Sequence, residues 1–186
     1  MILPRSFYTR DTLQVARDLL GKYLVYKDKS AKIIEVEAYI GQDDKACHAA
    51  CGKTKRNEVM FKKGGFAYIY LIYGMYNCLN ISTENEGFPA AVLIRALDLP
   101  GADGPGKLCR LFGLTRVQNG LDVTHPPLYI EDRPARHASP ARNAFVADGQ
   151  GDAGGEDIVE KILKTPRIGV DYAGKDAQLP WRFLIK

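Results

Sequence analysis

Several features are scarce in this chain of 186 residues, and each absence excludes a class of protein. No apolar run approaches the ~20 residues that a membrane span needs. The first residues, MILPRSFYTRDT, lack the apolar core of a secretory signal. These absences favour a cytosolic chain, in the cytoplasm or nucleoid, or in the nucleus if the source is eukaryotic. The four cysteines are then expected to be reduced thiols.

Metal and nucleotide motifs are also missing. Cys47, His48 and Cys51 lie close together, but a structural zinc site needs a second ligand pair that the sequence does not offer. We therefore expect no metal and no cofactor, and His48 reads either as a loop histidine bonded to the backbone or as a donor to a ligand. The GPGK sequence at 104–107 lacks the P-loop pattern, although it would place backbone N–H groups and Lys107 at a helix start, where a phosphate can bind.

The composition that is present is that of a globular protein. Hydrophobic residues make up 46% of the chain and charged residues 26%, and the formal net charge is +4. This length suits one domain with a sizeable core, spanning 1–186. The mildly basic balance is compatible with a polyanionic partner but is weak support by itself.

Periodicity and turn residues predict a mixture of strands and helices. Strands are expected at 23–26, 31–40, 68–73, 76–82, 90–97 and 128–131, and helices at 9–20 and 107–112. Arg133–Asp157 is rich in Ala, Gly, Pro and Arg with few large apolar residues, which predicts a flexible loop. The fold class expected from this order is α+β, with an antiparallel sheet.

The stretch YIYLIYGMYNCLN at 68–80 predicts an unusual β-hairpin. Hairpin tips are usually polar, but this one offers Tyr73 and Met75. An apolar tip either packs against the protein or enters another molecule, such as a base stack. A two-residue turn would put Tyr70 and Asn80 on opposite faces, whereas a three-residue turn or a bulge would put them on the same face. The sequence leaves this choice open.

Glu37 is a candidate general base because it lies between apolar neighbours on a predicted strand. Spacing alone favours a plainer reading, in which Glu35 and Glu37 line a solvated face together with Ile33 and Tyr39. Arg95 interrupts the apolar strand AAVLIRAL, and a buried arginine there would need a carboxylate such as Glu37, or a phosphate.

Aromatic and basic residues extend this set of candidates. Tyr39 and Tyr70 could sandwich a planar, cationic heterocycle, although core packing is the commoner fate of strand tyrosines. A group of basic residues precedes the hairpin, at Lys53, Lys55, Arg56, Lys62 and Lys63. Each could be a solvated surface charge, but together they place positive charge near an apolar tip.

Taken together, the segments EVEAYIGQDDKACH, TKRNEVMF, YIYLIYGMYNCLNIS, AVLIRALDL, GPGKL and PRIGV resemble the alkyladenine (3-methyladenine, methylpurine) DNA glycosylase family. The resemblance runs from about residue 13 to 121 and resumes near 165–183. It implies a single domain with a curved antiparallel sheet, surrounding helices and a protruding hairpin. It also implies a base-excision repair enzyme that flips an alkylated or deaminated purine out of duplex DNA and hydrolyses its N-glycosidic bond.

The resemblance assigns roles to individual residues. Glu37 matches the family's general base, and Arg95 matches a residue that helps to position the water and the flipped nucleotide. The remaining matches are the pocket residues Tyr39, His48, Tyr70 and Asn80 and the wedge Tyr73 with Met75; Asn80 would clash with the 2-amino group of normal guanine. We further expect Arg56 and Lys107 to contact the DNA backbone, and a monomeric, monofunctional enzyme without strand cleavage. The long insert at 133–157 and the Asp171-Tyr172 pair depart from the family pattern.

Two other functions remain open at this stage. A non-catalytic module could bind distorted DNA through the hairpin, and a hydrolase could act on a free nucleoside or other small molecule. The basic residues beside an apolar tip argue against the small-molecule hydrolase.

Overall fold

The computed structural model describes residues 1–133 and 161–185, so the predicted loop at 133–157 lies, apart from Arg133, outside the described residues. The helices are α1 (Arg5–Tyr8), α2 (Thr12–Leu19) and α3 (Pro105–Phe112), with 3-10 turns η1 (His48–Cys51), η2 (Glu58–Phe61), η3 (Arg116–Gln118) and η4 (Asp171–Gln178). The strands are β1 (Tyr23–Tyr26), β2 (Lys29–Ile40), β3 (Ala67–Ile72), β4 (Tyr76–Ser82), β5 (Ala90–Leu97), β6 (Leu128–Glu131), β7 (Ile162–Thr165) and β8 (Arg182–Ile185).

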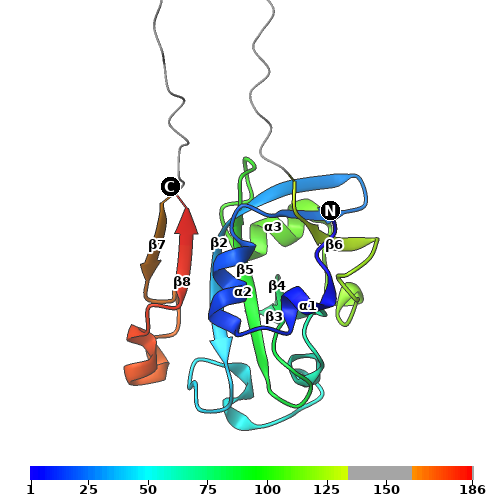
Figure 1. The fold of residues 1–186 in the computed structure, drawn as a ribbon. Helices are drawn as coiled ribbons and strands as arrows, with labels where there is room; N and C mark the ends of the chain where they lie inside the picture. Colours follow the sequence, from blue (N-terminus) through cyan, green and yellow to red (C-terminus); the bar gives the residue numbers. More distant parts are fainter. Residues whose placement is uncertain (134–160, 186) are drawn as a thin grey trace, which may run out of the picture.

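These strands form one curled antiparallel sheet. Its main order is β3-β4-β5-β2-β1-β6, and β8 pairs with both β2 and β7. The long strand β2 is shared: its first residues pair with β1 and the rest with β5 and β8. Figure 1 shows α2 lying across the sheet and the β7–β8 pair beside β2. The expected α+β fold with an antiparallel sheet and surrounding helices is confirmed.

Local sequence explains where the main helices begin and end. The side chain of Asp11 accepts a hydrogen bond from the N–H of Gln14, so α2 starts at Thr12. The predicted start at Thr9 was wrong, because a separate short helix, α1, ends just before it. Helix α3 ends before Gly113 as predicted, and Gly113 takes the left-handed conformation that ends many helices, but the helix begins at Pro105 rather than at residue 107. No helix among the residues described is long and apolar enough to cross a membrane.

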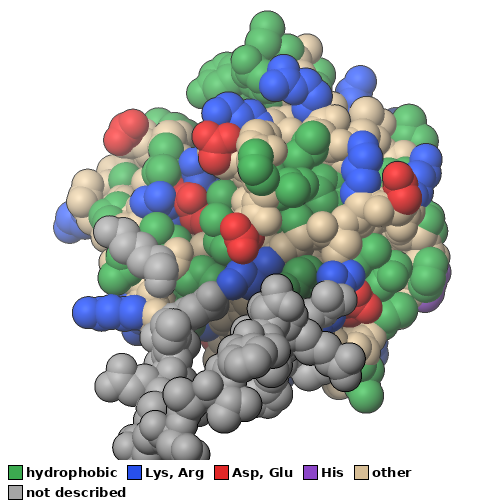
Figure 2. Space-filling view, turned by 90° about the horizontal axis from the view of Figure 1, so that it is seen from above, with side chains coloured by type: hydrophobic (Ala, Val, Ile, Leu, Met, Phe, Trp, Pro, Cys, Tyr) green, Lys and Arg blue, Asp and Glu red, His purple; other side chains and the backbone are tan. Residues whose placement is uncertain are grey.

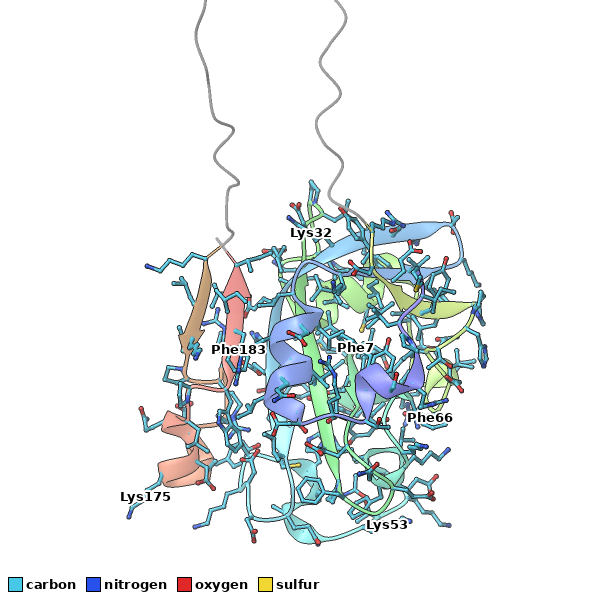
Figure 3. All side chains as sticks on the ribbon, viewed as in Figure 1. Phe7, Lys32, Lys53, Phe66, Lys175 and Phe183 are labelled. Atoms are coloured by element: carbon cyan, nitrogen blue, oxygen red, sulfur yellow. The ribbon has the colours of Figure 1, made fainter. Side chains whose placement is uncertain are left out.

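The sheet packs its hydrophobic core on the face covered by α2. Val15 and Leu19 of α2 are fully buried in this core together with Val36 of β2 and Ile94 of β5. Figure 3 shows Phe183 of β8 next to α2, and this side chain belongs to the same core. On β2, β4 and β5, the residues that alternate with these core residues therefore point to the other face of the sheet.

Two register shifts lie in the middle of the β2–β5 pair. Ile33 pairs with Leu97, Glu35 with Ala96 and Val36 with Ile94, so neither Ile34 nor Arg95 has a partner across the ladder. An extra residue reverses the alternation of side chains. Ile33 consequently lies in the core with Val36, and the prediction that it shares a face with Glu35 and Glu37 was wrong. Arg95 lies on the opposite face from Ile94, as in a regular strand, and the shift on β5 brings Leu97 into the core.

Candidate active site

A cavity of about 650 Å³ opens on the face of the sheet opposite α2. That size is typical of a pocket for a small organic group. Four groups of residues line it: strand residues Tyr39, Tyr68, Tyr70, Ile72, Tyr76, Cys78, Asn80, Leu93 and Arg95; the loop residues Ala46, His48 and Met60; the turn residue Tyr73 with the start of α3 at Gly104, Pro105, Gly106, Lys107 and Arg110; and the later segment Ile168, Gly169, Val170 and Tyr172.

The hairpin register decides which of its residues reach the cavity. Ile72 pairs with Tyr76, which leaves a three-residue turn, and Tyr70 pairs with Cys78. Asn80 therefore lies on the same face as Tyr70, which decides the choice that the sequence left open. The amide of Asn80 is fixed in place, because its Nδ2 donates to the carbonyl oxygens of Tyr68 at 3.1 Å and Cys78 at 3.3 Å.

The turn of this hairpin exposes two large side chains. Tyr73 is 81% exposed and Met75 66% exposed, so neither packs against the rest of the described chain. The backbone of Tyr73 and Gly74 has positive φ angles of 53° and 71°, as a tight turn between twisted strands requires. Figure 2 shows hydrophobic side chains gathered in a raised group at its upper edge, with Lys or Arg side chains beside them. Such an exposed apolar group marks an interaction surface.

Glu37 lies directly behind the wall of the cavity. It is fully buried, so the prediction of a solvated strand face was wrong for this residue. The Tyr39 hydroxyl donates to Oε2 at 2.8 Å, and the backbone N–H of Ile168 donates to Oε1 at 2.8 Å. The Arg95 guanidinium approaches the same Oε1 at 3.4 Å. These two hydrogen bonds and the nearby cation offset the loss of water around a buried carboxylate.

Arg95 joins Glu37 to a second carboxylate. Its Nε donates to Glu35 at 2.8 Å, and Glu35 also accepts from Nε of Arg182 at 2.6 Å. The expectation that Arg95 needs a carboxylate partner is confirmed, with Glu35 as the nearer one. Two acidic and two basic groups thus balance each other on strands β2, β5 and β8.

His48 and the tyrosines form the aromatic part of the cavity. The His48 ring lies edge-on to Tyr70, with 4.4 Å between the ring centroids. Its Nδ1 is 2.9 Å from the Tyr68 hydroxyl, so of the two readings left open for His48, the bond to the backbone was wrong. Burial, with Arg56 nearby, lowers the pKa of His48 to about 4, and the ring is neutral at pH 7. Burial and the neighbouring Glu37 raise the pKa of Tyr39, which keeps its hydroxyl a hydrogen-bond donor.

A profile for the family described as "Methylpurine-DNA glycosylase (MPG)" matches residues 6–102 and 100–186 of the chain. The chain belongs to the methylpurine-DNA glycosylase family.

Relatives agree with this assignment. The chain is 49% identical over 208 aligned positions to a protein of Methanocella arvoryzae named "Putative 3-methyladenine DNA glycosylase", covering 100% of this chain and 92% of the relative. A protein of the same name from Anaeromyxobacter sp. (strain Fw109-5) is 44% identical, with 100% and 90% covered. Another from Sodalis glossinidius is 61% identical over 66% of this chain and 75% of the relative. The chain is thus a DNA glycosylase by family, a hydrolase of DNA repair whose substrate is DNA.

Two of the predicted DNA-contacting cations of this glycosylase lie at the rim. Lys107 lines the cavity, and its Nζ pairs with Asp103 at 2.9 Å. Arg56 is exposed, with its guanidinium 5.7 Å from the centre of the Tyr70 ring. Next to Lys107, glycine is required at Gly106, because a Cβ there would lie 2.9 Å from Cδ1 of Tyr76. Helix α3 therefore packs directly against the hairpin.

Residues of the later segment contribute to the site in a way that sequence reasoning missed. Ile168 supplies an N–H to Glu37, and Tyr172 lines the cavity while 72% exposed. Arg167, which is 5% exposed, pairs with Asp44. The sequence indicated PRIGV only as part of the family pattern. The backbone N–H of Ile168 could not be predicted as a donor, because any residue type except proline carries that group. Among the residues described, no cluster of His, Cys, Asp or Glu is arranged to hold a metal ion.

The depressed pKa of His48 predicts a component of acid sensitivity. The unfolded chain binds a proton at His48 near pH 6.5, whereas the folded protein binds it only near pH 4. Folding free energy from this group is therefore fully present above pH 6.5 and is lost as pH falls toward 4. We expect His48→Gln to remove about 2 kcal/mol of the pH dependence over that interval. Urea unfolding at pH 7, 6, 5 and 4 measures it.

His125 provides the matched control, because its side chain is 64% exposed. His125→Gln should leave the acid dependence close to that of the wild type. An unchanged slope in His48→Gln would contradict the neutral, buried imidazole.

Proposed function

We propose that this glycosylase flips an alkylated or deaminated purine out of duplex DNA and hydrolyses its N-glycosidic bond, leaving an abasic site. The substrates would be of the 3-methyladenine type, with 7-methylguanine and hypoxanthine as further candidates. The observation that carries the proposal is the fully buried Glu37, held by Tyr39, Ile168 and Arg95 immediately behind an aromatic cavity. A carboxylate at such a place can stabilise positive charge that develops on a sugar.

For an alkylated base, the proposed reaction needs little besides this carboxylate. Alkylation at N3 or N7 makes the purine cationic, so the C1′–N bond breaks with its electron pair going to a base that leaves neutral. A neutral base such as hypoxanthine would leave as an anion, which the solvent protonates. Glu37 stabilises the oxocarbenium-like sugar and takes a proton from the water whose oxygen bonds to C1′. An ionised carboxylate can accept about four hydrogen bonds, and the two found here leave room for that water. Arg95 would orient the water and the nucleotide.

The cavity walls would select the base. Tyr39, His48 and Tyr70 would surround it, and electron-rich rings favour a cationic purine over a neutral one. The neutral His48 imidazole adds no competing charge. Asn80, fixed by two backbone carbonyls, would clash with the 2-amino group of normal guanine. Selectivity would then combine attraction for the damaged base with exclusion of guanine.

The exposed surface around the cavity would hold the duplex. Tyr73 and Met75 would fill the gap that the flipped nucleotide leaves in the base stack. Arg56 and Lys107 would contact phosphates, which makes binding weaken with salt. We propose that the enzyme works as a monomer. We also propose that it is monofunctional, since the lysine that lines the cavity, Lys107, is paired with Asp103 at the rim.

Base release from a defined duplex tests this proposal. Duplexes carrying one hypoxanthine, methylated DNA and an undamaged duplex are incubated with the enzyme, with and without alkali. We expect free damaged base and alkali-dependent strand cleavage, and neither free base nor cleavage with the undamaged duplex. Lesion binding without free base would favour the non-catalytic module instead. Turnover of a free nucleoside without duplex would favour the small-molecule hydrolase, and cleavage without alkali would contradict the monofunctional assignment.

A further inference from the structure

Arg167 and Asp44 form a buried ion pair beneath the cavity. The side chains are 0% and 1% exposed, and two parallel hydrogen bonds of 2.6 and 2.8 Å join them. The Arg167 guanidinium lies between two aromatic rings, 4.9 Å from the centre of Tyr39 and 5.0 Å from that of Trp181. A guanidinium with paired donors and stacked rings has one well-defined position.

This pair connects two segments that are distant in sequence, 38–46 and 167–176. Arg167 donates to the carbonyl of Ala38, between Glu37 and Tyr39 on β2, at 3.0 Å. It also donates to the carbonyl of Asp176 in η4 at 3.1 Å. Asp44 in turn accepts from the backbone N–H groups of Ile40 at 3.2 Å and Ala46 at 3.0 Å. The loop that continues to Ala46 and His48 and the segment that contains Ile168 are therefore tied to the same point of β2.

The Arg167–Asp44 pair lies close to Glu37 in the structure, and this position suggests what the pair does. Ile168 follows Arg167 in the chain, and its N–H is the backbone donor to Glu37. A shift of Arg167 would move that N–H off the carboxylate, and a shift of Asp44 would move the Ala46–His48 side of the cavity. Neither Arg167 nor Asp44 lines the cavity itself.

We propose that the Arg167–Asp44 pair is a positioning element for catalysis, which holds the Ile168 N–H on Glu37 and fixes the Ala46–His48 wall. This inference rests on the proposed function, because it concerns the rate of the same base release. The pair acts through other residues and touches neither the base nor the reacting atoms.

Single-turnover kinetics with saturating enzyme test the inference. Arg167→Ala and Asp44→Asn are each expected to slow base release about a hundredfold, while affinity for the lesion duplex changes by less than about threefold. Because the two side chains act as one unit, the double variant should be no slower than either single variant. If Arg167→Ala does not fold, Arg167→Lys replaces it, since lysine keeps the charge but loses the paired donors.

Val15→Ala is the matched control for a general loss of stability. Val15 is fully buried in the core on the opposite face of the sheet, so this variant is destabilised without a change at the site. It should release base at the wild-type rate at a temperature where all variants are folded. Any of three results would overturn the inference: base release by Arg167→Ala or Asp44→Asn as fast as by Val15→Ala, a loss confined to DNA binding, or additive effects in the double variant. A wild-type enzyme that releases no base would instead refute the proposed function.

Discussion

Glu37→Gln is expected to slow the release of a damaged base by on the order of a thousandfold, because glutamine cannot take a proton from water or stabilise positive charge. Glutamine has nearly the shape of glutamate, and its amide oxygen can still accept the N–H of Ile168. Binding of the lesion duplex should therefore be retained. The measurements are single-turnover base release and a binding isotherm on the same hypoxanthine duplex.

Glu35→Gln is the control for this change. It makes the same substitution two residues earlier on β2, at a side chain that is 17% exposed and bonded to Arg95 and Arg182. We expect a far smaller loss of rate, because Glu35 does not contact the Tyr39 hydroxyl or the Ile168 N–H. Unchanged base release by Glu37→Gln would rule out Glu37 as the general base. Equal losses of rate in both variants would mean that the experiment does not distinguish Glu37 from Glu35.

Arg95→Met should lower the free energy of unfolding by about 3 kcal/mol, because it leaves the carboxylate of Glu37 buried without its nearest cation. The side chain of Arg95 is 15% exposed and that of Glu37 is fully buried, so water does little to compensate. Base release should fall as well, since Arg95 lines the cavity. Urea unfolding and single-turnover kinetics measure the two effects.

Arg182→Met is the control that shows how much of this loss of stability comes from the unpaired Glu37. Arg182 pairs with Glu35 but is not an ion-pair partner of Glu37, and the side chains of Arg182 and Glu35 both remain partly accessible. We expect a loss below about 1 kcal/mol, since Glu35 keeps Arg95 as a partner. The double variant Glu37→Gln with Arg95→Met should lose less than the sum of the two single changes. Equal destabilisation by Arg95→Met and Arg182→Met would contradict the account.

Much of the fold could be read along the chain. The strands at 23–26, 76–82, 90–97 and 128–131 were predicted with the bounds that the structure has, because alternation and flanking turn residues are local signals. Gly104 and Gly113 likewise marked the ends of α3. The start of α2 was misplaced, because Asp11 caps this helix and the separate helix α1 ends just before Thr9.

The site was only partly accessible to the same reasoning. The candidate residues could be named from their chemistry and from the family pattern, and the structure brings Tyr39, His48, Tyr70, Asn80 and Arg95 to one cavity. Spacing favoured a solvated Glu37, because a strand pattern does not say what covers its second face. That face is covered by the segment at Ile168, more than a hundred residues away in the chain.

The sequence by itself determined the family, the strands and the residue types that could do chemistry, because these depend on neighbours within a few positions. Only the tertiary structure decided how these residues face one another. The three-residue turn put Tyr70 and Asn80 on one face, and the register shifts turned Ile33 and Leu97 into the core. Such shifts depend on pairing between strands, and the donors around Glu37 come from distant segments. Neither the register shifts nor these distant donors produce a periodic pattern in the sequence.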